Sequence, residues 1–387
     1  EAFLSVSHPL LRGGGLDYNL ASIRLAINDK EISEEEFRRQ ALKVVFDIEQ
    51  AYWNLVRAYE DLRVSIKSLQ VAMDNRKSSW HQVAAGTRPE LDLTTADAGV
   101  ATRLSAVIGS EAGVRDREDQ LKNLVNLPRS WYLKDLHIEA ADRPKTEIDP
   151  ASHQLDLGAV LETALKCRPE TMQAQLAVNS AAFTIRQRRN ELMPTLNVKG
   201  TIAYSGLESS HWSAAETLGD FKYFRRGVAL TFDYPIGNRA ADAALRQAKL
   251  ARTSARLQNE RVQQNIVVTV RAALRDIRTN VQRVLTTQKA RDLHRERLVA
   301  EQRKKEVGLA TSLDVLDVEE DFVRAERDYV NALIDYQISL ANLDKEMGTL
   351  LDVRGLHISS LMDRERITDR PAIRSLEEQA AEQKPAP

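Results

Sequence analysis

Three short segments of the chain carry apolar residues at every second position, the pattern of a β-strand with one apolar face. They lie at residues 2–7, 195–204 and 227–234, with mostly polar or small residues between. Pro9 and Pro235 follow the first and the third segment and end these strands. The alternation therefore predicts three amphipathic strands. Their apolar side comprises Ala2, Leu4, Val6, Leu196, Val198, Ile202, Tyr204, Val228, Leu230 and Phe232.

Elsewhere the apolar residues recur at steps of three and four, which is the seam of a coiled coil. We expect helices at about 17–85, 91–127, 157–192, 238–307 and 312–347. Roughly 70 residues from 238 to 307 contain no proline or glycine, and a helix of that length spans roughly 105 Å. Gly86 and Gly308 interrupt the long helices and predict two antiparallel hairpins. The seam residues are Val45, Ile48, Tyr52, Leu55, Tyr59, Leu62, Ile66, Leu69 and Met73 in the first long helix, and Val267, Val270, Leu274, Ile277, Val281 and Val284 in the second.

The two hairpins align with each other at a constant offset of about 222 residues, which indicates an internal two-fold repeat. Gly86 then corresponds to Gly308 and Asp92 to Asp314, and the two seams coincide. We divide the chain accordingly. Residues 1–128 form the first repeat, 129–156 a connector, 157–350 the second repeat and 351–387 a charged tail that we expect to be disordered.

These patterns predict a mainly α-helical protein with a small β part, in which long coiled-coil hairpins continue from the strands. Three strands leave open sheet edges, and pairing with further copies would close them. The apolar side of such a closed sheet would face lipid. An amphipathic hairpin lying on a soluble core would show the same alternation.

Charge and composition exclude several classes of protein. There are 55 Lys and Arg residues against 56 Asp and Glu, so no basic excess supports nucleic-acid binding. Cys167 is the single cysteine, and the seven histidines show no metal-ligand spacing. No phosphate loop, nucleophile motif or cluster of histidines with carboxylates is present, so we expect neither enzymatic activity nor a cofactor.

Several short motifs resemble the TolC-like outer-membrane efflux protein family. The segment 307–317, Val-Gly-Leu-Ala-Thr-Ser-Leu-Asp-Val-Leu-Asp, resembles the helical turn at the periplasmic tip of that family, and 85–93 is its counterpart in the first repeat. The segment 193–198, Met-Pro-Thr-Leu-Asn-Val, resembles the passage from helix into strand. The resemblance covers about residues 1–350. Relative to the family repeat, the opening helix and strand of the first repeat are missing, so we expect the chain to lack an N-terminal segment.

This resemblance implies a homotrimer in the bacterial outer membrane. The three chains would share one transmembrane β-barrel, and their helices would form an α-barrel tunnel through the periplasm. The tunnel would be a passive conduit of a tripartite efflux or type I secretion system. Its partners would be a periplasmic adaptor protein, an inner-membrane pump and outer-membrane lipid.

The resemblance also implies an acidic constriction at the tip, formed by Asp314 and Asp317 together with Asp92. Asp314 and Asp317 lie one turn apart and share a helix face. A ring of such carboxylates attracts cations, and their mutual repulsion raises their pKa values. Acidic residues in the first turn of a helix also favour its dipole and need no further role.

The tip turn itself contains Gly86 and Gly308, with Thr87, Val307 and Leu309 as residues that would contact the adaptor. Arg88 is either a solvated arginine or the partner of an acidic residue on a neighbouring tip. Two other classes stay open on the pattern alone. A periplasmic adaptor has one hairpin flanked by β-domains, and a non-membrane coiled-coil scaffold would not need the strands.

Overall fold

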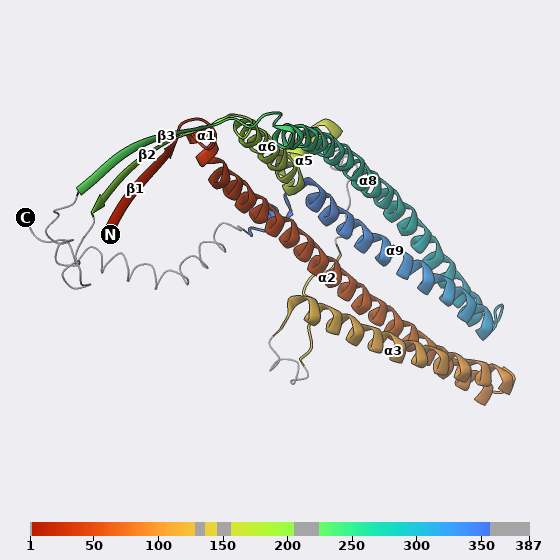
Figure 1. The fold of residues 1–387 in the computed structure, drawn as a ribbon. Helices are drawn as coiled ribbons and strands as arrows, with labels where there is room; N and C mark the ends of the chain where they lie inside the picture. The colour runs from red at the N-terminus through yellow and green to blue at the C-terminus, as the bar shows by residue number, and fades with distance from the viewer. Residues whose placement is uncertain (1, 128–135, 145–155, 205–223, 357–387) are drawn as a thin grey trace, which may run out of the picture. The chain divides into compact units, whose positions relative to one another are not determined.

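The computed structural model describes residues 2–127, 136–144, 156–204 and 224–356 of the 387-residue chain. The chain forms two compact units, each built from segments far apart in the sequence. Unit 1 comprises Glu1–Phe37 and Pro169–Asn265, and unit 2 comprises Arg38–Arg168 and Ile266–Pro387. Unit 1 holds the strands, and unit 2 holds most of the two helical hairpins (Figure 1).

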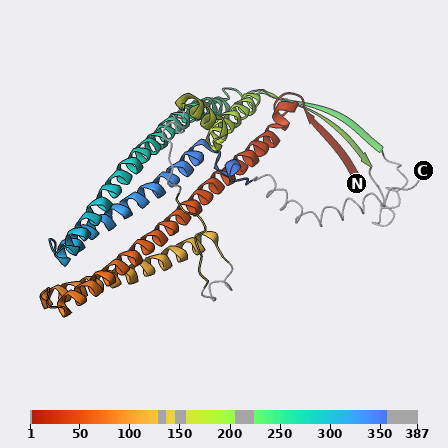
Figure 2. The same cartoon turned by 180° about the vertical axis from the view of Figure 1, so that it is seen from behind.

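The three predicted strands form one antiparallel sheet in the order β1–β2–β3 (Figures 1 and 2). Strand β1 is Ala2–Pro9, β2 is Thr195–Tyr204 and β3 is Phe224–Asp233. The register places Val6, Gly200 and Val228 in one row across the sheet, and it pairs Ile202 with Arg226 in the next row. Residues paired across neighbouring strands point to the same face. The predicted apolar residues therefore share one face.

This apolar face is largely open to solvent in the single chain. Leu4 is 66% exposed and Val228 is 84% exposed. Leu196 and Val198, nearer the helices, are half-buried, and the side chain of Tyr204 lies outside the described residues. A row of exposed apolar side chains on a folded sheet needs a further partner.

Asn190 holds the turn that leads from β1 into the first long helix. It is the last residue of α6 (Pro169–Asn190), and its side-chain oxygen accepts a hydrogen bond from the Gly13 N–H at 2.7 Å. Its side-chain nitrogen donates to the carbonyls of Leu11 and Gly14 at 3.3 and 3.2 Å. One amide thus satisfies three backbone groups of the glycine turn, which precedes the short helix α1 (Leu16–Asn19).

The single helix predicted at 157–192 is wrong, because the segment forms two helices. Helix α5 is Leu157–Cys167, capped by the Asp156 side chain, and α6 begins at Pro169. The backbone of Arg168 between them is extended, with a ψ of 129°. A proline excludes the helical conformation from the residue before it, which explains the break.

Four long helices form two antiparallel hairpins (Figures 1 and 2). They are α2 (Ala21–Ala84), α3 (Glu90–Val125), α8 (Arg239–Glu306) and α9 (Ser312–Met347). Leu55, Val114 and Leu121 form the core between α2 and α3. In α8 the predicted positions Val270, Leu274, Ile277, Val281 and Val284 are buried, so the seam of the second hairpin is confirmed.

The seam predicted for α2 is confirmed only in its first part. Leu55 is fully buried, but Ile66 is 49% exposed and Met73 is 55% exposed. Apart from Val64, the buried positions in this part of α2 are small or polar, as at Ser65 and Ser68. The prediction failed because it assumed a single apolar partner, whereas here α2 also contacts the second hairpin through these polar residues.

The described part of the connector, residues 136–144, lies against the first hairpin. The Tyr59 hydroxyl donates to the Ile138 carbonyl at 2.9 Å, and the Tyr52 hydroxyl donates to the Asp142 carboxylate at 2.8 Å. The fully buried Glu118 carboxylate lies 3.2 Å from the His137 ring. These contacts anchor the chain after α3.

Order continues past residue 350, where we expected the tail to begin. Helix α10 is Leu350–Val353, and Leu350 and Leu351 are buried against Leu42 and Phe46 of α2. The tail beyond residue 356 lies outside the described residues. Gly348 makes this continuation possible, since its φ of 76° turns the chain at the end of α9.

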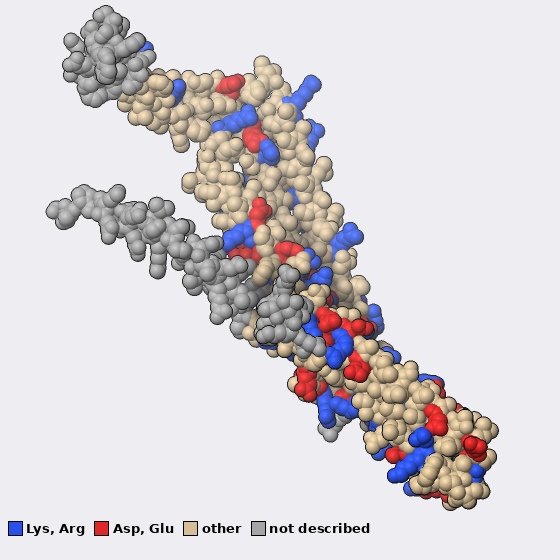
Figure 3. All heavy atoms as spheres, turned by 90° about the horizontal axis from the view of Figure 1, so that it is seen from below, with Lys and Arg blue, Asp and Glu red and all other residues tan. Residues whose placement is uncertain are grey.

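Among the described residues, no helix is long and apolar enough to cross a membrane. Figure 3 shows charged side chains distributed along the helices, while the strands present a mainly uncharged surface in that view.

The turn at Gly348 yields a first prediction. A Cβ at this position would lie 2.8 Å from the Cys167 carbonyl oxygen, in a backbone conformation that side chains rarely adopt. We expect Gly348→Ala to lower the free energy of unfolding by more than about 1 kcal/mol. Heating the detergent-solubilised protein while following its helical circular dichroism measures this. Gly109→Ala in α3 is the matched control, because its Cβ meets no atom within 4 Å. Equal melting temperatures for both variants would contradict the prediction.

Candidate functional site

The two helical tips turn in the same way, although they lie far apart in the sequence. In the first, Gly86 has a φ of 70°, its N–H bonds to the Val83 carbonyl at 2.9 Å, and Thr87 bonds back to the Gln82 carbonyl. In the second tip, Gly308 has a φ of 83°. The backbone hydrogen bonds that Gly308 and Leu309 donate repeat those of Gly86 and Thr87. Positive φ values explain why both turns require glycine.

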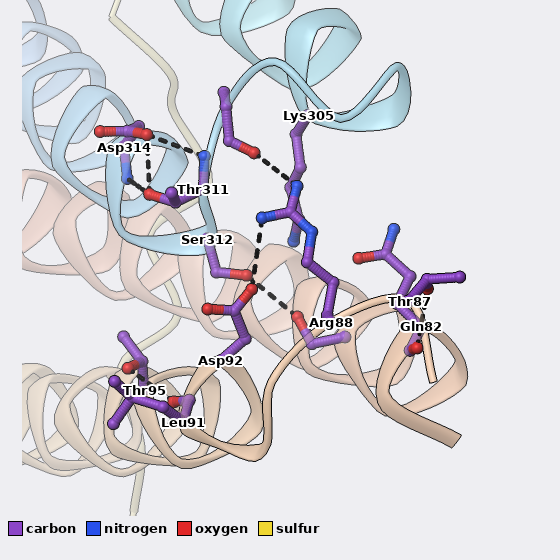
Figure 4. Close-up of polar contacts among 12 residues, drawn as sticks. Gln82, Thr87, Arg88, Leu91, Asp92, Thr95, Lys305, Thr311, Ser312 and Asp314 are labelled. Carbon is purple, nitrogen blue, oxygen red and sulfur yellow. Dashed lines mark hydrogen bonds and ion pairs between the residues drawn. The ribbon is translucent and has the colours of Figure 1, made fainter. Parts of the chain in front are cut away.

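Arg88 connects the first tip to the second within one chain. Its guanidinium lies 3.4 Å from the Asp92 carboxylate and donates to the Ala310 carbonyl at 2.9 Å (Figure 4). The Arg88 side chain is only 18% exposed. The interpretation as a solvated arginine is therefore wrong. Ala310 is the residue that corresponds to Arg88 in the second repeat, so the contact joins equivalent positions.

Two further polar contacts join the tips beside Arg88. The hydroxyls of Ser79 and Ser312 lie 3.1 Å apart, and both residues are buried. The ammonium group of Lys305 bonds to the side-chain oxygen of Asn75. Lys305 is buried, and desolvation together with the nearby Arg88 lowers the pKa of its ammonium group. The tips thus meet through hydrogen bonds and charges.

Asp314 lies in the first turn of α9 and caps that helix. Its carboxylate accepts the Thr311 N–H at 2.8 Å and the Thr311 hydroxyl at 2.7 Å, and its own N–H bonds back to that hydroxyl at 3.2 Å (Figure 4). These hydrogen bonds lower the pKa of Asp314 within one chain. Asp314 therefore stabilises the start of its own helix, and its carboxylate remains exposed to solvent.

The other two acidic residues of the predicted constriction differ in their exposure to solvent. Asp317 is exposed on α9. The Asp92 side chain is only 20% exposed, and its carboxylate pairs with Arg88. Pro89 occupies the position of Thr311 in the first repeat and provides no side-chain cap, so Asp92 is available to bind Arg88. A constriction built from exposed carboxylates would therefore rest on Asp314 and Asp317.

The polar contact between the hairpins continues away from the tips. The Ser68 hydroxyl donates to the Glu319 carboxylate at 3.1 Å, and Arg327 donates to the Ser65 hydroxyl at 2.8 Å. Arg57 forms an ion pair with Asp335. The predicted seams did not include these pairs, although one signal was present. Ser65, Ser68, Ala72, Asn75 and Ser79 follow each other at steps of three, four, three and four, which is a small polar stripe on α2.

The residues expected to contact an adaptor lie at the surface of the tips. Val307 is 71% exposed and Leu309 is 79% exposed, and Thr87 is exposed as well. Within the described ranges no group of three or more His, Cys, Asp or Glu side chains could hold a metal ion. The tips thus present exposed apolar residues at their turns, beside the charged contacts of Arg88 and Lys305.

Part of the chain matches a known protein family, and its fold matches solved structures. Residues 160–349 match the family "Outer membrane efflux protein". The outer membrane protein TolC of Escherichia coli (strain K12) is 22% identical over 331 residues, covering 82% of this chain and 64% of that protein. The outer-membrane channel CmeC of Campylobacter jejuni has a TM-score of 0.69 at 16% identity, covering 90% of this chain and 71% of the other. VceC of Vibrio cholerae has a TM-score of 0.69 at 19% identity, covering 89% and 79%.

The chain is therefore similar to the TolC-like outer-membrane efflux proteins, with the family match confined to residues 160–349. Its localisation is the bacterial outer membrane, with a part that extends into the periplasm. The chain spans less than two thirds of the length of the curated relatives it matches, 64% of TolC for example. The matches with solved structures show that the fold is shared.

In this TolC-like protein, Glu319 is the buried carboxylate between the hairpins. One of its oxygens accepts the Ser68 hydroxyl, and the other is buried without a partner among the described residues. Burial raises the pKa of Glu319, and the nearby Arg103 offsets this only in part. A raised pKa in the folded state stabilises the protein below the ordinary glutamate value of about 4.3, and this contribution is lost as pH rises through the folded value.

We therefore expect Glu319→Gln to raise the melting temperature at pH 7.5, because the amide keeps the shape without a buried charge. The gain should shrink as pH falls toward the ordinary glutamate value of about 4.3, because the raised pKa of Glu319 means that the carboxyl of the folded natural protein is already protonated there. Thermal unfolding across this pH range measures the effect. Glu320→Gln is the control, since Glu320 forms an exposed ion pair with Arg324 and should change little. A variant less stable than the natural protein at pH 7.5 would overturn the assignment.

Proposed function

We propose that this chain is the channel subunit of a tripartite efflux or type I secretion system. Three copies form a passive conduit across the outer membrane, with no catalytic chemistry of their own. The observation that carries the proposal is the sheet in unit 1, which has one exposed apolar face and two open edges. The names of the relatives support it, since they are outer-membrane efflux proteins and channels.

Each edge of the sheet needs a partner. Within the described residues β1 and β3 pair only with β2, so each has a row of unpaired backbone groups. A membrane offers no water to satisfy such groups, and only a closed barrel removes the edges. Edge-to-edge pairing of three copies closes the sheet, with the apolar face toward lipid and the side of Asn197, Thr201 and Thr231 toward a wet interior.

The helices need neighbours in the same way. Leu104 and Ile108 are exposed on α3. Leu285 and Leu293 are exposed on α8. These apolar residues lie away from the core that each helix shares with its own hairpin. Packing against helices of neighbouring copies covers them and encloses the periplasmic tunnel.

The tips form the gate of this tunnel. The contacts of Arg88 with Asp92 and Ala310 hold the second hairpin to the first and define a closed state. Asp314 and Asp317 from three copies surround the passage and attract cations. Exposed Val307 and Leu309 at the turn provide the contact for a periplasmic adaptor, which links the channel to an inner-membrane pump.

The acidic ring can be tested by its effect on ion selectivity. We expect the double variant Asp314→Asn, Asp317→Asn of the full-length protein to form channels that are less cation-selective, because the substitutions remove up to six charges per trimer. Asparagine can still accept the Thr311 N–H, so the helix cap remains. The measurement is the reversal potential in planar bilayers under a salt gradient. The double variant Glu320→Gln, Asp321→Asn removes the same charge further along α9 and should keep the selectivity. Equal shifts in both double variants would place the selectivity elsewhere.

The contacts of Arg88 at the tips can be tested by their effect on conductance. Arg88→Gln removes the ion pair with Asp92 and weakens the bond to the Ala310 carbonyl, so we expect a several-fold larger single-channel conductance. Arg76→Gln is the control, because Arg76 pairs with Asp97 at an exposed position of the same hairpin.

A cross-link provides the opposite change. Cysteines at Ser79 and Ser312, whose hydroxyls lie 3.1 Å apart, should hold the tips together under oxidising conditions. We expect this double variant to conduct poorly until a reductant is added. If Arg88→Gln and the oxidised cysteine variant both conduct as the natural protein does, the contacts between the tips do not gate the channel.

A further inference from the structure

The apolar face of the sheet contains a hollow of about 440 Å³. Leu4, Val6, Ile202 and Val228 line it, together with Gly200, Thr201, Arg226 and Gly227. Gly200 creates the hollow, because it lies between Val6 and Val228 in the register and has no side chain to fill the row. A Cβ built on Gly200 would meet no atom within 4 Å, so the space in front of it is open.

Arg226 stands at this hollow and is the single charged residue of the described apolar face. It pairs with Ile202, whose other neighbour is Leu4. Its side chain is exposed, and no described residue forms a recorded ion pair with it. The sequence analysis began the third strand at residue 227, so it did not assign Arg226 to this face. Arg225 precedes it and points to the opposite face.

The partner of this surface is most simply a lipid. Barrel closure pairs the edges of the sheet and leaves its faces uncovered, so the neighbouring copies do not fill the hollow. A cation on a lipid-facing strand is costly at the middle of the membrane and tolerated near its surface. There a guanidinium reaches phosphate oxygens and binds them with two parallel hydrogen bonds.

The position of Arg226 along the strand fits the membrane surface. Strand β3 runs from Phe224 toward the helices, and Arg226 is six residues from Phe232 near the helical end. At about 3.4 Å per residue the two residues lie roughly 20 Å apart along the strand, and a strand tilt of about 40° makes this about 15 Å along the membrane normal, in the outer half of an apolar band of about 25 Å. From there the long arginine side chain reaches the membrane surface. With the helices in the periplasm, Arg226 lies at the level of the outer leaflet.

We propose that the hollow at Gly200 binds one acyl chain of a phosphate-bearing glycolipid of the outer leaflet, and that Arg226 binds its phosphate. The proposal rests on the proposed function, because it requires the sheet to be part of a membrane barrel. Each protomer has one such site. Bound lipid at this position covers the exposed side chains of Leu4 and Val228 and supplies the counter-charge of Arg226.

Native mass spectrometry of the trimer in a neutral detergent, titrated with purified lipid A, tests the proposal. We expect up to three lipids per trimer to bind with the natural protein, and Arg226→Gln to bind at least about tenfold more weakly. Arg225→Gln is the matched control, since it removes the same charge from the opposite face and should bind as the natural protein does. Gly200→Leu fills the hollow without a clash and should also weaken binding with Arg226 intact.

The contributions of phosphate and acyl chain can be separated with two further probes. Lipid A without its phosphates should bind weakly to the natural protein, and inorganic phosphate should not compete with the intact lipid. Equal binding by the Arg226 and Arg225 variants would overturn the proposal, as would unchanged binding by Gly200→Leu. Planar-bilayer conductance separates this failure from that of the channel function, because the Arg226→Gln trimer should conduct as the natural trimer does.

Discussion

Toward their tips, the two hairpins of this chain contact each other through polar groups, while each hairpin packs along an apolar seam. An apolar seam tolerates small slips, because the hydrophobic effect has no direction. A buried hydrogen bond has few alternative partners, and losing it leaves a desolvated group without one. Contacts such as Ser68 with Glu319 and Arg88 with Ala310 therefore fix how the hairpins align.

The predicted repeat pairs two acidic positions that form different contacts in the structure. Asp92 and Asp314 are equivalent in sequence, and both lie in the first turn of a helix after a glycine turn. Thr311 engages Asp314 in a capping box, so this carboxylate stabilises its own helix. Pro89 offers no hydroxyl, and Asp92 binds Arg88 instead. A single difference at the capping position thus separates a helix cap from an ion pair with Arg88, the residue that contacts the second hairpin.

The sequence predicts the elements well and their mutual contacts poorly. Strand β2 and the seam of α8 follow from periodicity, because each is set by residues close together in the chain. The break at Pro169 was a local signal that the prediction overlooked. The bond from Arg88 to Ala310 is different, because it joins residues 222 positions apart and depends on how two tips meet. The polar stripe of α2 could be seen in advance, but its partner on α9 could not.

The sheet shows why a single chain of this kind is incomplete in two separate ways. Its edges lack backbone partners, and only another strand provides these in the required register. Its apolar face lacks side-chain partners, and strands added at the edges leave it open. Association and membrane insertion therefore satisfy different groups, and neither can replace the other. Arg226 is part of the face that lacks side-chain partners. A guanidinium among apolar residues is stable only where its environment changes from hydrocarbon to phosphate. In the proposed membrane barrel, Arg226 near the start of β3 thus indicates how deep the sheet would lie.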